Sequence, residues 1–165
     1  MNEENRDLDA EAAHKSTNKA PGWSIFLLVA LVAHQCEEWW GGPGFSAWAQ
    51  ATLGVDLTPA RFLVINAIGL LLFTAGMIGA IRSARLAWLV VTISALLVLN
   101  GTIHVLATAA FATYSPGTLT GALLYLPLGG LALFSMFHSL PRPVYWRAVF
   151  AGIAIHALAT LAALS

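Results

Sequence analysis

The sequence predicts an all-α fold, a polytopic membrane helical bundle of about five transmembrane helices. The chain has 165 residues, of which 58% are hydrophobic and only 10% charged. A soluble domain carries about 25% charged residues, and a domain of this size cannot hide so much apolar surface. The apolar residues form continuous runs without the period-two alternation of barrel strands, and only helices or closed barrels can cross a membrane. The eight basic residues are balanced by eight acidic ones, which excludes nucleic acid as a partner bound through bulk positive charge.

Five apolar runs define the expected helices. They span residues 23–40, 59–81, 86–114, 117–138 and 144–164, and each is near the about 20 residues that cross the hydrocarbon core. Gly41-Gly42-Pro43-Gly44 ends the first run, and residues 45–53 form an amphipathic segment expected at the membrane interface. Thr58 and Pro59 are an N-cap and a first helical residue. Ser115-Pro116-Gly117 predicts a tight turn before the fourth run.

Charge divides the chain into a tail and a membrane domain. Residues 1–20 hold half of the charged residues and show no apolar periodicity, which predicts a disordered charged cytoplasmic tail before a five-helix transmembrane domain over 21–165. Basic residues gather near the starts of the odd-numbered helices, at Lys15, Lys19, Arg82, Arg85, Arg142 and Arg147, whereas the other two loops hold only Arg61. Because short cytoplasmic segments are rich in these residues, we expect a multi-pass protein of the cell (inner) membrane with the N-terminus cytoplasmic and the C-terminus external.

Few ionisable side chains lie inside the runs, and such residues are candidates for a functional site because charge in lipid is costly. They are His34, Glu37, Glu38, His104 and His156. The first three follow i, i+3, i+4 spacing, which places them on one helical face. The expected orientation puts all five at similar depth, together with three uncharged polar residues, Asn66, Asn100 and Tyr125. The sequence therefore predicts one internal polar site, in which these last three support the others.

The motif His34-x-x-Glu37-Glu38 on a first transmembrane helix resembles the signature of the HXXEE-domain family of small bacterial integral membrane proteins. The spacing Asn100-x-x-x-His104 and the Tyr114-Ser115-Pro116-Gly117 turn are similar to features that recur in that family. The resemblance covers roughly residues 24–160. It implies no settled activity, but it does imply that the positions of His34, Glu37 and Glu38 matter.

Three imidazoles with one or two carboxylates form a ligand set that suits a divalent metal such as zinc. We expect His34, His104 and His156 to bind the metal, with one of the two glutamates, assigned here as Glu38, completing the ligands. The other acts as a base or orients a ligand histidine, and Glu37 and Glu38 are the expected catalytic residues. Trp39, Trp40 and Phe111 are expected to line the substrate pocket. Because metal-bound water can act as hydroxide, the leading hypothesis is a metal-dependent membrane enzyme acting on a membrane lipid or a lipid-like small molecule.

Two other functions use the same residues. A metal-free Glu/His pair can protonate and deprotonate an isoprenoid or sterol-like lipid, which predicts an isomerase or cyclase. Protonatable residues at depth also serve non-enzymatic proton-coupled transport or sensing, although the sequence has no internal repeat of the kind found in transporters. A homo-oligomer remains open, because it could complete a transport pathway.

Overall fold

The computed structural model describes residues 20–164, and every regular element in that range is helical. The elements in chain order are η1 (Gly22–Ile25), α2 (Phe26–Trp40), α3 (Phe45–Leu53), α4 (Pro59–Arg82), η2 (Ala84–Leu86), α5 (Trp88–Phe111), α6 (Thr118–Thr120), η3 (Gly121–Tyr125), α7 (Leu126–Phe137) and α8 (Arg142–Leu164). Elements η1 and η2 are 3-10 turns, and η3 is a π-helix. The predicted helical bundle is confirmed, whereas residues 1–19 of the predicted tail lie outside the described residues.

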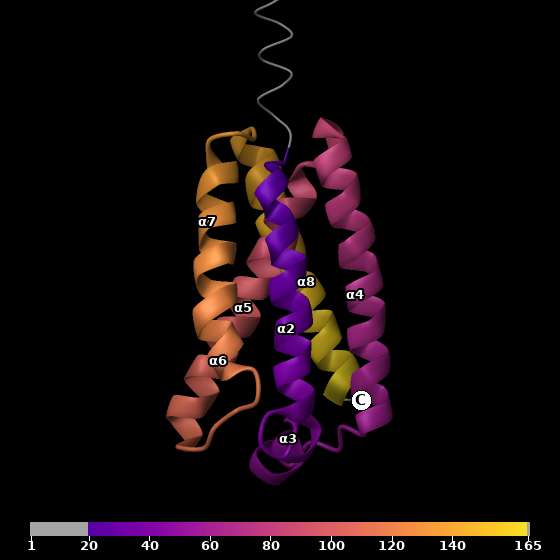
Figure 1. Cartoon of the computed structure of the whole chain (residues 1–165), viewed down its shortest axis with the longest axis vertical. Helices are drawn as coiled ribbons and strands as arrows, with labels where there is room; N and C mark the ends of the chain where they lie inside the picture. The colour runs from indigo at the N-terminus through magenta and orange to yellow at the C-terminus, as the bar shows by residue number, and fades with distance from the viewer. Residues whose placement is uncertain (1–19, 165) are drawn as a thin grey trace, which may run out of the picture.

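Four stretches in the described range are long and apolar enough to cross a membrane. They are Pro59–Arg82, Ala84–Phe111, Thr118–Phe137 and Arg142–Ala163. The first predicted span differs, because α2 has only 15 residues and ends in the polar sequence around Glu37 and Glu38. It nevertheless runs alongside the other helices (Figure 1). The described residues therefore fit a membrane protein with four candidate spans and a shorter fifth helix that carries the polar motif.

Helix α5 is the centre of the bundle. Half of its membrane window is buried inside the protein, against 11% for α4 and for α8. Glycines allow the neighbouring helices to approach it closely, as small residues do in membrane proteins. A Cβ atom on Gly152 of α8 would lie 2.4 Å from the carbonyl oxygen of Thr92, and one on Gly101 would lie 3.0 Å from that of Gly121. The Thr92 hydroxyl also donates to the Ala148 carbonyl at 3.1 Å. Residues on α5 therefore face several helices at once.

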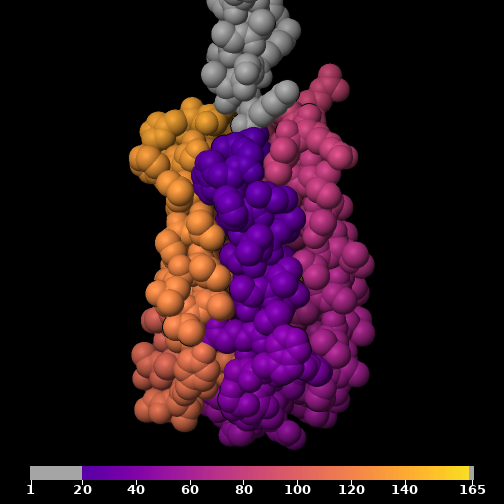
Figure 2. Space-filling model, viewed as in Figure 1, coloured from indigo at the N-terminus to yellow at the C-terminus, as the bar shows by residue number. Residues whose placement is uncertain are grey.

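The two ends of the bundle are different. The chain reverses from α4 to α5 and from α7 to α8 at the end where α2 begins, and α3, α6 and the C-terminal end of α8 lie at the other (Figure 1). Helix α3 has the bounds expected for the amphipathic segment, and Thr58 caps α4 by accepting from the Arg61 amide at 3.2 Å, as predicted. Figure 2 shows α2 in the space-filling surface between α7 and α4. The polar end of α2 thus lies in the half of the bundle that α3 covers.

Candidate metal centre

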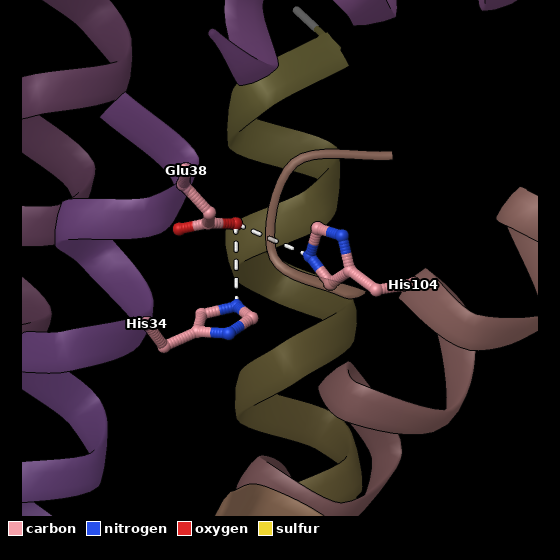
Figure 3. Close-up of side chains that lie close together, drawn as sticks. All are labelled: His34, Glu38 and His104. Atoms are coloured by element: carbon pink, nitrogen blue, oxygen red, sulfur yellow. Dashed lines mark ion pairs between the residues drawn. The ribbon is translucent and has the colours of Figure 1, made fainter. Parts of the chain in front are cut away.

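His34, Glu38 and His104 come together inside the bundle. His34 and Glu38 lie one turn apart on α2, and His104 reaches them from α5 (Figure 3). The Nε2 atoms of His34 and His104 are 3.5 and 3.2 Å from the same oxygen, Oε1 of Glu38. All three side chains are buried, and one ligand atom from each lies within 4.8 Å of the others. Within residues 20–164, this is the group of His, Cys, Asp and Glu side chains close enough to share a metal ion.

Hydroxyl groups hold the far side of both imidazoles. The Nδ1 atom of His34 is 2.8 Å from Oγ1 of Thr120, and the Nδ1 atom of His104 is 3.0 Å from Oγ of Ser115. A histidine that binds a metal through one nitrogen typically has its other nitrogen hydrogen-bonded, which fixes the tautomer and the orientation of the ring. Both rings are therefore held with Nε2 turned toward Glu38.

Glu37 determines which nitrogen of His34 carries the proton. Its carboxylate accepts from the Thr120 hydroxyl, the Tyr114 hydroxyl, and the amides of Thr120 at 2.7 Å and Leu119 at 3.0 Å. The single hydroxyl hydrogen of Thr120 is thus given to Glu37, so the Thr120 oxygen accepts from the Nδ1–H of His34. In the neutral imidazole, Nε2 of His34 then carries the lone pair. That atom is buried and has no hydrogen-bond partner.

The turn between α5 and α6 fits closely around the two rings. Gly117 has φ +107°, and a Cβ atom there would lie 2.8 Å from the Cε1 atoms of both His34 and His104. Only glycine can satisfy the backbone angle and the contact together. The ring of Tyr125 stacks on His34 with centroids 4.2 Å apart, and Phe45 lies 5.2 Å from His104. The positions of the imidazoles are therefore set by backbone and aromatic rings as well as by hydroxyls.

The three side chains open onto a cavity of about 670 Å³. Its walls come from α2, α3, α4, α5 and α8 and are mostly apolar, with Leu31, Phe62, Ile68, Leu72, Leu96 and Leu158 among them. The predicted residues Phe111, Asn66, Asn100 and Tyr125 also line it. Asn66 accepts from the side-chain amide of Gln35, through its backbone oxygen at 3.2 Å and its Oδ1 at 3.3 Å, which joins α4 to α2. The site is a small polar group at the wall of an apolar chamber.

His156 lines the same cavity but stands apart from the three possible ligands. Thr160 donates its hydroxyl hydrogen to the carbonyl of His156 at 3.0 Å, and its oxygen is 3.4 Å from Nδ1 of the same residue. Nε2 of His156 is 3.5 Å from the Asn100 amide nitrogen. The imidazole is thus engaged with Asn100 and Thr160, which separates it from the ligand set that the sequence predicted.

Three other predicted site residues do not reach the cavity. Glu37, expected to be catalytic, faces the α6 turn, and Trp39 and Trp40, expected in the substrate pocket, do not line it. Trp40 is 73% exposed. The physical reason is the helical repeat of about 100° per residue, which turns the neighbours of Glu38 away when Glu38 itself points inward. The two tryptophans are therefore not part of the wall of this cavity.

Sequence reasoning missed the residues that support the ligands. Ser115 and Gly117 were visible only as parts of a tight turn, and nothing in the pattern marked Thr120, which lies in an apolar stretch. The aromatic contribution of α3, through Phe45 and Trp48, was also missed, although both line the cavity. The sequence did offer a signal for the turn. Ser115-Pro116-Gly117 follows the helix that carries His104, and residues in such a turn can contact the side chains of that helix.

Comparison with known proteins places the chain in a family. The family model described as "Protein of unknown function with HXXEE motif" matches residues 25–132. This range contains His34, Glu37, Glu38 and His104 and the turn that supports them, while α8 lies outside it. No curated protein and no solved structure matches the chain. Since the match covers well over half of the sequence, the resemblance noted from the motif is confirmed, and the chain belongs to the HXXEE family.

Proposed function

We propose that His34, Glu38 and His104 bind a divalent metal ion, with zinc the best fit, at the centre of a membrane enzyme. The observation that carries this proposal is the bare Nε2 of His34, buried without a hydrogen-bond partner and facing a carboxylate oxygen at 3.5 Å. Two electron-pair donors that face each other in a buried site call for a cation between them.

The spacing of the ligand atoms suits zinc. A tetrahedron with bonds of about 2.1 Å has edges of about 3.4 Å. The two imidazole nitrogens lie 3.5 and 3.2 Å from the Glu38 oxygen. Two histidines and one glutamate are also a known ligand set of catalytic zinc sites, in which the fourth position stays open for water or substrate. Here the open side is the apolar cavity.

A zinc ion in such a site polarises carbonyl oxygens and lowers the pKa of its bound water. The chain's own residues would hold the ion and exclude bulk water with the apolar walls. His156 is the remaining imidazole on the cavity wall among the described residues, and we assign it the role of proton acceptor. The proposed activity is hydrolysis of a lipid-like or membrane-accessible small molecule.

A second candidate function keeps the same residues and replaces the metal by a proton. The 3.2 Å separation of His104 Nε2 and Glu38 Oε1 is also an ordinary hydrogen-bond distance. A proton shared there supports acid–base isomerisation of a lipid, or proton-coupled transport or sensing.

Metal analysis of the protein purified in detergent separates the two. We expect about one divalent ion per chain in the wild type, and loss of the ion in His34→Ala and in His104→Ala. The matched control is His138→Ala, because that ring contacts Phe134 and Phe137 away from the cavity. His156→Ala should keep the ion. A wild type that stays metal-free after incubation with zinc would overturn the metal proposal in favour of the shared proton.

A further inference from the structure

The cavity reaches the outer surface of the bundle between α4 and α8. Lining residues on these two helices are exposed, including Ile68 and Leu72 on α4 and Ile155 and Leu158 on α8, with Leu72 and Leu158 each 64% exposed. Both pairs lie well inside the membrane spans Pro59–Arg82 and Arg142–Ala163. The opening therefore faces the hydrocarbon of the bilayer and not water.

The end of the bundle near the metal site is covered instead. Helix α3 lies across this end (Figure 1), and its residues Phe45, Trp48 and Ala49 form part of the cavity wall. Trp48 and Ala49 are buried, and the Trp48 indole donates to the Thr113 hydroxyl at 3.3 Å, which ties α3 to the residues that follow α5. A molecule from the water phase meets this cover, whereas a molecule in the bilayer meets an apolar opening.

We propose that the ligand of this site is a bilayer lipid with one apolar chain, which enters sideways between α4 and α8. Its chain lies along the apolar wall, and its oxygen-bearing head lies at His34, Glu38 and His104. This inference rests on the proposed metal centre for the place of the head, but the place of the chain depends on the cavity alone. Pockets of about 300–1,000 Å³ hold drug-sized ligands, and the volume of about 670 Å³ suits one chain better than a whole two-chain phospholipid.

Gly69 offers a way to close the chamber without touching the metal ligands. It lies on α4 in the cavity wall, and a Cβ atom there would have no neighbour within 4 Å. Gly69→Phe therefore fills space that the lipid chain would occupy. Gly130→Phe is the matched control, because Gly130 lies on α7, also has no neighbour within 4 Å of an added Cβ, and does not line the cavity.

The test uses a fatty acid with a photoreactive diazirine in its chain, mixed into phosphatidylcholine vesicles that contain the full-length protein. After illumination, the labelled residues are mapped by mass spectrometry. Exposed side chains such as Leu71 and Phe134 report the surrounding bilayer, whereas Phe62 and Trp48 are buried and line the cavity. We expect labelling of Phe62 or Trp48 in the wild type, a decrease of about tenfold in Gly69→Phe, and no change in Gly130→Phe.

The same samples are analysed for metal, which keeps the two proposals apart. Labelling of the inner wall that disappears in Gly69→Phe supports the lipid site whether or not metal is present. Labelling confined to the outer residues in the wild type overturns it, as does inner-wall labelling that is equal in Gly69→Phe and Gly130→Phe. A wild type that contains metal but shows no inner-wall labelling would support the metal centre and contradict the lipid site.

Discussion

The carboxylate of Glu37 is connected to the imidazole of His34, one turn earlier on α2, through the hydroxyl of Thr120. The two glutamates of the motif therefore differ in their tasks. Glu38 faces the buried group of ligand atoms, while Glu37 stands outside the cavity and orients His34 from behind. Glu37 is a positioning residue, and its effect on the proposed metal depends on a side chain from another helix.

Thr120→Val should weaken zinc binding without removing it. Valine keeps the shape of threonine but cannot accept the Nδ1–H of His34, and loss of such an outer partner costs about 10–100-fold in metal affinity. The affinity is measured by competition with a chelator of known strength. Thr120→Ser, which keeps the hydroxyl, should restore binding. Thr102→Val is the control, since that hydroxyl bonds the Val98 carbonyl at 2.7 Å within α5; equal losses in the two valine variants would contradict this role.

Gly117→Ala should displace both imidazoles and lower zinc affinity at least tenfold. The added Cβ would lie 2.8 Å from each ring, and the backbone angle of +107° is unfavourable for alanine. Gly42→Ala separates these two causes, because Gly42 has φ +55° and free space around an added Cβ. We expect Gly42→Ala to affect thermal stability alone. Unchanged zinc affinity in Gly117→Ala would show that the turn does not position the rings.

The phenol of Tyr114 should lose its proton at a higher pH than an ordinary tyrosine. It lies between the spans that end at Phe111 and begin at Thr118, and partial burial together with its hydrogen bond to Glu37 raises its pKa to about 12. The folded protein thus favours the neutral phenol, which adds to the free energy of unfolding. This addition is complete below the ordinary pKa of about 10 and disappears as the pH rises through about 12. The difference in tyrosinate absorbance between wild type and Tyr114→Phe isolates this group. Glu37→Gln should move its midpoint back toward 10; a wild-type midpoint already near 10 would contradict the contact.

The orientation in the membrane is still a prediction from charge. The ends of α4 and α7 and the start of α2 lie at one end of the bundle (Figure 1), next to Arg82, Arg85 and Arg142. We expect this end in the cytoplasm and the candidate site nearer the outside. A reporter active only outside the cytoplasm, fused after residue 165, should be active, and the same reporter placed in the loop at Ser83 should be silent. The reverse result would show that the protein has the opposite orientation in the membrane.

Sequence alone was sufficient for the helices and for one half of the site. Helix length and apolar runs are local properties, so the short α3 and four of the five expected spans could be predicted, whereas α2 is shorter than the first predicted span. The i, i+4 spacing placed His34 and Glu38 on one face for the same reason. The approach of His104 was expected from its depth only. Depth does not say which faces of two helices meet, and it could not separate His104 from His156, which contacts Asn100 and Thr160 instead.

The residues that support the proposed ligands could not be predicted from the sequence pattern. Thr120 looks like a helix residue in an apolar run, and its importance arises only when α6 meets the end of α2. Trp39 and Trp40 were expected to line the pocket, but two successive helical positions cannot both share the direction of Glu38. Contacts between distant segments, which the sequence does not encode locally, decided both cases.

The π-helix η3 makes the site depend on the number of residues in a segment. Thr120 and Tyr125 are five positions apart, and both contact His34. In an α-helix, residues five apart point about 140° away from each other, whereas the wider turn of a π-helix, with its i to i+5 bonding, brings their directions closer together. The number of residues between these two positions therefore matters as well as their identity, although Gly121 is also constrained, because a Cβ atom on it would lie 3.1 Å from the Cα atom of Gly101. A chain with one residue fewer there would wind as a regular α-helix and keep every signature residue, yet it would have lost the support of its histidine.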